Sequence, residues 1–162
     1  LPCLYVIENN QWGMGTAAKR AVAVQPIAEH FAKAYGISSY TLNGMDFFDC
    51  YAGFQAALKE VITTSRPVLI EAVAERFRGH SISDPALYRS KEDLQKVMTQ
   101  DPILRLKQFL IEKKMLTEEE YERMDKEYRD LIVSAMQYAD SSPWPDPITL
   151  EEGVFAPEDG GK

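Results

Sequence analysis

Three short apolar segments alternate with amphipathic ones in the first half of the sequence, and this alternation limits the fold more than any other feature. The apolar segments are residues 3–8 (CLYVIE), 37–44 (ISSYTLNG) and 67–77 (PVLIEAVAERF). Short apolar runs between polar boundaries are typical of buried parallel strands. Helices are expected between them, one beginning at Pro26 and one capped by Asp46 and running to Thr64. The pattern therefore predicts an α/β fold with a parallel sheet.

From residue 90 onward the pattern becomes helical. Ser90 with Asp93, Asp101 before Pro102, and Thr117 with Glu120 are predicted helix caps. They indicate helices over residues 91–98, 102–114 and 118–139. The last twenty residues are rich in proline and acidic side chains and favour an extended tail. Three regions are thus expected: an α/β region over 1–89, a helical region over 90–142 and the tail over 143–162.

Charge and cysteine content narrow the possible functions. Residues 1–90 carry as many acidic as basic side chains, so the whole net charge of −7 lies in residues 91–162. Without a basic stripe, a nucleic-acid partner is disfavoured. Cys3 and Cys50 lie far apart and show no metal-binding spacing, which favours a reducing compartment. No apolar run approaches the roughly 20 residues that span a bilayer, so no membrane association is expected.

Two loops are expected at the carboxyl ends of predicted strands, where ligands bind in parallel sheets. The first, NNQWGMGT, begins with Asn9 and Asn10. The side-chain oxygen of Asn10 suits Mg²⁺ or Ca²⁺, a carbonyl two residues later could add a second ligand, and Gly13 and Gly15 would permit close approach of the backbone. Alternatively, the two asparagines simply form a turn that ends the strand.

The second loop, RGHSISDPALYRS, contains His80, one of two histidines in the chain. Arg76 and Arg78 precede His80, and Ser81, Ser83 and Asp84 follow it. Cations, an imidazole and hydroxyls at the end of a strand suit a phosphorylated ligand. The alternative is a surface loop with a solvated histidine.

Four stretches in matching order resemble the alpha subunit of the thiamine-diphosphate-dependent pyruvate dehydrogenase component, within the 2-oxoacid dehydrogenase family. They are ENNQWGMGT, NGMDFFDCYAGFQAALKEV, RPVLIEAVAERFRGHSISDPALYRS and DPILRLKQFL. The likeness extends to about residue 140 and corresponds to the C-terminal half of that subunit. It implies part of the thiamine-diphosphate-binding fold, followed by a helical C-terminal region. The start at Leu1, without an initiator methionine, also suggests a piece of a longer protein.

The resemblance assigns roles to individual residues. Asn10 would bind Mg²⁺ through its side chain, and Trp12 would bind it through its backbone carbonyl. Gly13 and His80 would lie against thiamine diphosphate, and His80 would also act as the catalytic residue near the substrate channel. The family's Gly-Asp-Gly element, which supplies an aspartate ligand, is absent from this sequence, so the predicted site is incomplete.

The resemblance also implies an activity and its partners. The reaction would be oxidative decarboxylation of pyruvate, with acetyl transfer to a lipoyl group on the acyltransferase component. The cofactor would lie between alpha and beta subunits in a two-alpha, two-beta heterotetramer. The 162 residues alone are expected to be inactive. A bacterial, cytoplasmic enzyme is expected, with a plastid or mitochondrial matrix location as the alternative.

Other functions remain open from the sequence alone. An acetoin or branched-chain 2-oxoacid dehydrogenase would share most of these motifs, although GMGT and GHSISDP favour pyruvate. A cofactor-free α/β interaction module is an alternative of another class. Ser81 corresponds to a serine phosphorylated in mitochondrial relatives, whereas Ala17 and the shorter segment Ala86–Tyr88 lack the other phosphorylated serines. Control by a kinase is therefore not expected.

Overall fold

The computed structural model describes residues 1–154 and divides the chain into two compact units. The first unit is Leu1–Met115 and the second begins at Leu116. The first contains the sheet and the helices that cover it. The second consists mainly of one long helix.

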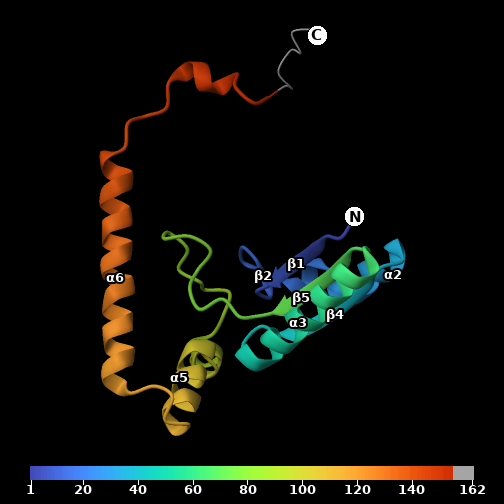
Figure 1. Ribbon diagram of the computed structural model, residues 1–162, viewed down its shortest axis with the longest axis horizontal. Helices are drawn as coiled ribbons and strands as arrows, with labels where there is room; N and C mark the ends of the chain where they lie inside the picture. The colour runs from blue at the N-terminus through green and yellow to red at the C-terminus, as the bar shows by residue number, and fades with distance from the viewer. Residues whose placement is uncertain (155–162) are drawn as a thin grey trace. The chain divides into compact units, whose positions relative to one another are not determined.

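A three-stranded parallel sheet forms the centre of the first unit (Figure 1). Strand β5 (Val68–Val73) lies between β1 (Leu4–Asn9) and β4 (Ser38–Asn43). Val68 pairs with Leu4 and Ser38, and Val73 pairs with Asn9 and Asn43. The predicted parallel α/β fold is confirmed. Strand β5 ends at Val73, earlier than predicted, because both neighbouring strands end at the same level.

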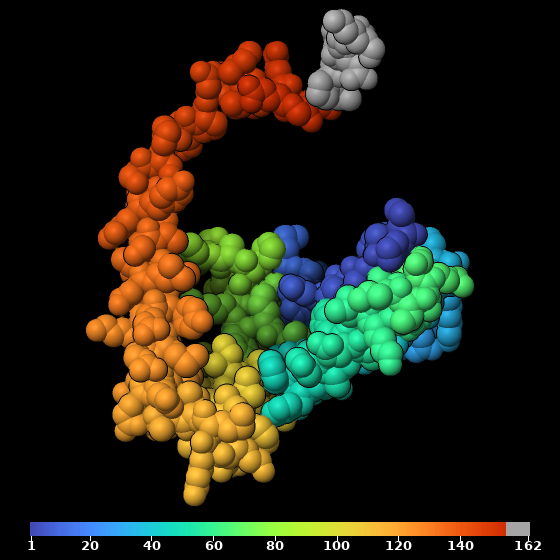
Figure 2. All heavy atoms as spheres, in the orientation of Figure 1, coloured from blue at the N-terminus to red at the C-terminus, as the bar shows by residue number. Residues whose placement is uncertain are grey.

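Helix α3 (Phe47–Thr64) covers one face of the sheet. The core there consists of Leu42, Ala57, Val61, Val68 and Ile70. Gly53 allows this close packing, since a Cβ at that position would overlap the side chain of Leu42. The predicted cap is confirmed, because Asp46 accepts hydrogen bonds from Phe48 N and Asp49 N. In Figure 2 this helix forms the teal-to-green surface of the first unit.

Helix α2 (Ile27–Tyr35) packs against β4 and β5. Its buried residues are Ala28 and Ala32, whose small side chains permit a close approach. Val68 and Ile70 belong to the core under α3, and successive residues of a strand point to opposite faces. Leu69 and Glu71 therefore point to the face opposite α3, where Glu71 reaches the amino end of α2.

Residues 9–25 differ from the loop that the sequence predicts. They contain a short antiparallel pair, β2 (Trp12–Gly13) with β3 (Thr16–Ala17), and one turn of helix, α1 (Ala18–Ala21). Met14 at the hairpin turn has a φ of 53°. Elements of two to four residues are too short to produce a recognisable hydrophobic period, which explains why the pattern did not reveal them.

The three predicted C-terminal helices are confirmed, as are their caps. Helices α4 (Lys91–Met98) and α5 (Pro102–Glu112) belong to the first unit, whereas α6 (Glu118–Ser141) belongs to the second. Within α6 no residue is buried. A short 3₁₀ helix, η1 (Pro147–Leu150), follows within the predicted tail, and residues 155–162 of that tail lie outside the described part. Among the described residues no helix has the length and apolar character needed to cross a membrane.

Candidate functional site

The two predicted loops leave the sheet side by side. Asn9, the last residue of β1, pairs with Val73, the last residue of β5, and the two strands are parallel. The chain therefore leaves both strands at the same edge of the sheet, as the sequence predicted. The segment that follows Asn9 is called the β1 loop (residues 10–16), and residues 78–89 are called the β5 loop.

Side-chain amides shape the start of the β1 loop. Gln11 N donates to Asn9 Oδ1 at 3.1 Å, and Trp12 N donates to Asn10 Oδ1 at 3.0 Å. Gln11 adopts a left-handed conformation with a φ of 67°. Both asparagines thus form the turn that the simpler interpretation predicted. An amide oxygen has two lone pairs, so this turn leaves Asn10 Oδ1 able to accept a second partner.

Asp84 organises the β5 loop. Its carboxylate accepts hydrogen bonds from His80 N at 2.7 Å, Ala86 N at 2.8 Å and the Tyr88 hydroxyl at 2.8 Å. The backbone N–H of His80, followed by that of Ala86, lowers the pKa of Asp84 below its ordinary value. Gly79 lies directly against this residue, and a Cβ there would overlap the backbone oxygen of Asp84.

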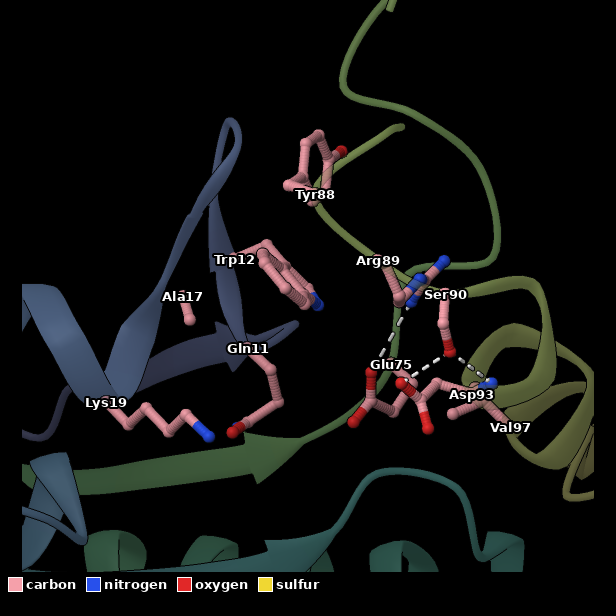
Figure 3. Close-up of a pocket in the computed structure, with 10 residues that line it drawn as sticks. All are labelled: Gln11, Trp12, Ala17, Lys19, Glu75, Tyr88, Arg89, Ser90, Asp93 and Val97. Atoms are coloured by element: carbon pink, nitrogen blue, oxygen red, sulfur yellow. Dashed lines mark hydrogen bonds and ion pairs between the residues drawn. The ribbon is translucent and has the colours of Figure 1, made fainter. Parts of the chain in front are cut away.

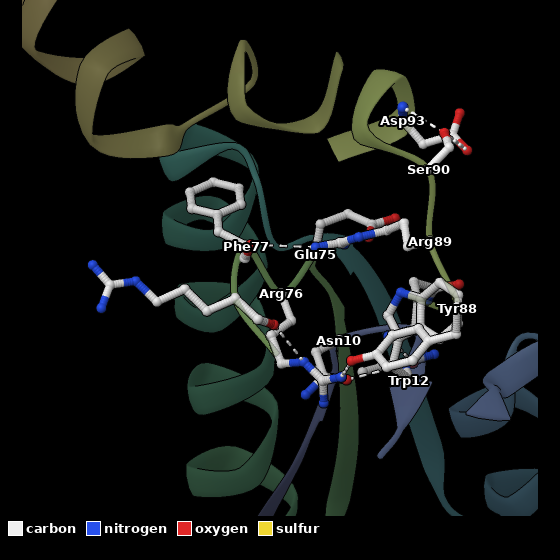
Figure 4. Close-up of polar contacts among 12 residues, drawn as sticks. Asn10, Trp12, Glu75, Arg76, Phe77, Tyr88, Arg89, Ser90 and Asp93 are labelled. Carbon is white, nitrogen blue, oxygen red and sulfur yellow. Dashed lines mark hydrogen bonds and ion pairs between the residues drawn. The ribbon is translucent and has the colours of Figure 1, made fainter. Parts of the chain in front are cut away.

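Arg76 and Tyr88 join the two loops (Figure 4). Arg76 Nη2 donates to Met14 O at 2.7 Å and lies 2.6 Å from the Tyr88 hydroxyl, to which it also donates. The rings of Trp12 and Tyr88 lie 4.9 Å apart. Gly15 also faces the Tyr88 ring, since a Cβ at that position would lie 3.0 Å from Tyr88 Cδ1. The β1 and β5 loops therefore form one connected structure.

The predicted site residues fall into two groups. Asn10, Trp12 and Gly13 lie together at the β1 loop, whereas His80 lies on the β5 loop. The imidazole of His80 is exposed and forms no hydrogen bond with any residue in the range 1–154. Their roles in binding and catalysis remain predictions.

A cavity of about 330 Å³ opens beside the joined loops (Figure 3). Gln11, Trp12 and Lys19 line one side of it, while Glu75 and Arg89 line the other. Arg89 Nη1 lies 3.7 Å from Glu75 Oε2, and Arg89 Nη2 donates to Phe77 O. Burial raises the pKa of Glu75, and the charge of Arg89 opposes that rise. The cavity thus has both acidic and basic groups on its wall.

Sequence reasoning missed the residues that connect the loops. It gave Arg76 a role only as a cation near His80, and it gave Tyr88 and Arg89 none. Their contacts join positions that are distant in sequence, such as Arg76 and Met14, which lie 62 residues apart. The signal that was available is the Tyr-Arg pair itself, since a large amphipathic side chain and a cation in a polar loop are suited to partly buried hydrogen bonds.

The residues at the β1 loop fit part of a magnesium site. Asn10 Oδ1 and the Trp12 carbonyl are neutral oxygen donors on one short loop, and Mg²⁺ prefers oxygen ligands. Within residues 1–154 there is no group of three or more histidine, cysteine or acidic side chains that could hold a metal ion. Any such ion would therefore need further ligands besides those of this segment.

Comparison with known proteins identifies the class. The family model for the dehydrogenase E1 component matches residues 1–148, and the chain belongs to this family.

Similar proteins are alpha subunits of the pyruvate dehydrogenase E1 component. The chain is 34% identical over 155 residues to that of Rickettsia typhi, with 96% of this chain and 47% of the relative covered. Identity to the Rhizobium meliloti subunit is 39% over 156 residues, covering 96% of this chain and 44% of the relative. The mitochondrial subunit of Schizosaccharomyces pombe is 37% identical over 158 residues, covering 96% and 37%. The chain thus spans less than half the length of these curated relatives, and it corresponds to a partial alpha subunit.

Proposed function

We propose that the chain is the C-terminal part of the alpha subunit of a thiamine-diphosphate-dependent pyruvate dehydrogenase (acetyl-transferring). The observation that carries this proposal is the joined pair of loops at the carboxyl ends of β1 and β5, in a chain of the dehydrogenase E1 component family. The names of the similar alpha subunits favour pyruvate over acetoin or a branched-chain 2-oxoacid as the substrate.

In this proposal the two loops hold a cofactor. When bound, thiamine diphosphate supplies the electron sink for decarboxylation of a 2-oxoacid. Asn10 and the Trp12 carbonyl would bind the Mg²⁺ that neutralises the diphosphate, and Gly13 would let the backbone approach it. His80 would stabilise charge near the reacting end. A beta subunit would complete the site in a two-alpha, two-beta assembly, and a lipoyl group on the acyltransferase component would accept the acetyl group.

Variants of Asn10 separate metal binding from turn formation. Ser at position 10 keeps a short side-chain acceptor for the turn, but it does not reach as far as an amide oxygen. We expect Asn10→Ser to weaken Mg²⁺-dependent binding of thiamine diphosphate by at least tenfold, whereas Asn10→Asp retains binding. The measurement is calorimetry on the full-length alpha subunit assembled with its beta subunit. Full binding by Asn10→Ser would show that Asn10 is only a turn residue.

Substrate choice and cofactor dependence have their own tests. Turnover of pyruvate, acetoin and a branched-chain 2-oxoacid by the assembled enzyme identifies the substrate, and activity on acetoin alone would overturn the choice of pyruvate. Failure of the full-length assembly to bind thiamine diphosphate would instead favour a cofactor-free interaction module. The location also remains a proposal, bacterial and cytoplasmic, because the similar subunits include bacterial, mitochondrial and chloroplastic ones.

A further inference from the structure

Glu71 is a buried carboxylate at the centre of the sheet. It lies on β5, between Ile7 of β1 and Thr41 of β4, and only 1% of its surface is exposed. It forms no ion pair with any residue between 1 and 154. Burying a charge is costly unless hydrogen bonds compensate for the lost water. Its hydrogen bonds therefore explain how it is retained in an otherwise apolar strand.

Two donors from different elements bind this carboxylate. Asn9 Nδ2 donates to Glu71 Oε1 at 2.6 Å, and Ala28 N donates to Glu71 Oε2 at 2.9 Å. Ala28 is at the amino end of α2, where the capping residue Pro26 supplies no side-chain hydrogen bond. Glu71 thus caps α2 from the neighbouring strand, where a negative charge also interacts favourably with the helix dipole.

The same carboxylate determines the orientation of Asn9. A carboxylate accepts hydrogen bonds but cannot donate them, so the NH₂ group of Asn9 must face Glu71. Asn9 Oδ1 is thereby directed to Gln11 N, from which it accepts a hydrogen bond. This bond begins the turn of the β1 loop. The left-handed backbone conformation of Gln11 needs such support, because a residue other than glycine is strained at positive φ.

We propose that Glu71 is a positioning residue for the β1 loop, which holds the proposed Mg²⁺ ligands. By fixing Asn9, it holds Asn10 and the Trp12 carbonyl in one arrangement and ties this loop to the amino end of α2. The inference rests on the proposed function for the identity of the ligand. The hydrogen bonds that carry it are independent of that function.

Replacing Glu71 by glutamine tests the role with almost no change of shape. Glutamine has one acceptor and one donor group. If its oxygen accepts from Ala28 N, its own NH₂ must face the NH₂ of Asn9, which places two donors against each other. Flipping Asn9 would only move the mismatch to Gln11 N. We expect Glu71→Gln to weaken Mg²⁺-dependent thiamine diphosphate binding about tenfold in the assembled full-length enzyme. Without cofactor, amide hydrogen exchange at residues 10–13 should also accelerate.

A double variant restores the pairing by exchanging donor and acceptor. In Asn9→Asp with Glu71→Gln, the glutamine introduced on β5 would accept from Ala28 N and donate to the carboxylate introduced on β1. That carboxylate would keep its second oxygen for Gln11 N. Calorimetry and hydrogen exchange should then recover most of the wild-type behaviour. If Glu71→Gln alone does not fold, recovery of folding and binding by the double variant provides the test.

A control separates positioning from general loss of stability. Val61→Ala weakens the core under α3, on the other face of the sheet, and should leave cofactor affinity and exchange at residues 10–13 unchanged. The inference is overturned if Glu71→Gln matches the wild type in both measurements, or if the double variant is no better than the single one. If the wild-type assembly itself fails to bind thiamine diphosphate, the proposed function is wrong, and hydrogen exchange alone decides the role of Glu71.

Discussion

The two loops of the site are each held by one carboxylate, yet the carboxylates work in opposite ways. Glu71 is buried and binds donors from β1 and α2, so it ties the β1 loop to the rest of the fold. Asp84 is partly exposed and binds donors from its own loop, at His80, Ala86 and Tyr88. The β1 loop should therefore open only when its bonds to Glu71 break, whereas the β5 loop can open while those bonds remain intact.

The largest expected effect comes from removing the buried carboxylate. Glu71→Leu leaves the NH₂ of Asn9 and the backbone N–H of Ala28 buried without acceptors. Each such group costs about 1–3 kcal/mol, so we expect the free energy of unfolding to fall by about 3 kcal/mol. Urea denaturation of the full-length alpha subunit measures this loss of stability. Glu29→Leu, on the exposed side of α2, is the control, and equal losses in both variants would contradict the comparison.

Disrupting the β5 loop should have a strong effect that remains local. Gly79→Ala places a methyl group against the backbone of Asp84 and forces the loop apart. We expect cleavage by trypsin after Arg78 to accelerate about tenfold, since local opening costs little in a loop with few buried contacts. Gly13→Ala is the matched control in the β1 loop, where a Cβ meets no atom closer than 3.9 Å. Unfolding of the whole chain by Gly79→Ala would contradict local opening.

Removing the hydroxyl of Tyr88 should destabilise the β5 loop less than Gly79→Ala does. Tyr88→Phe keeps the ring against Trp12 but removes the hydrogen bonds with Arg76 and Asp84. At about 0.5 kcal/mol each, the low end of the range and suited to a partly exposed loop, the two bonds contribute about 1 kcal/mol together, which corresponds to about fivefold faster amide exchange in residues 78–89. Exchange in residues 10–13 should accelerate less. If this variant accelerates amide exchange more in residues 10–13 than in residues 78–89, the β1 loop is the less firmly held of the two, contrary to the comparison.

Among these perturbations, protonation of Asp84 at low pH should loosen the β5 loop the least. Hydrogen bonds, first from His80 N, lower the pKa of Asp84 in the folded chain. Their contribution is therefore complete above the unfolded value of about 3.9 and is lost as the pH falls through the lowered folded value. Fluorescence of Trp12, recorded in a Trp144→Phe background, should report loosening of the Tyr88 contact only below about pH 4. Asp84→Asn should lack this acid step, and its persistence would assign the step to another group.

Local signals predicted most of the fold. Asp46, Ser90, Asp101 and Thr117 were identified as caps because a cap and its donors lie within three residues of each other. Local signals do not show which apolar side chains of α3 are buried. Its buried residues are Ala57 and Val61, while Tyr51 and Ile62 are exposed, since this helix is apolar on more than the side that faces the sheet.

The site was only partly predictable, for a related reason. The turn at Asn10 joins residues two positions apart and could be anticipated from asparagine chemistry. The bonds of Glu71 to Asn9 and Ala28 join residues 62 and 43 positions apart, and they depend on strand order and helix placement. One clue was present: a single carboxylate within PVLIEAV is unusual for a buried strand and signals hidden donors.

The close contact between Gly53 and Leu42 has a consequence for how the sequence can vary. A hydrogen atom at position 53 sets the distance between α3 and the sheet, because any larger group would overlap the leucine methyls. The two positions should therefore change only as a pair. In a library that randomises both, alanine or serine at 53 should survive selection for folding together with valine or alanine at 42, and leucine at 42 should survive only with glycine.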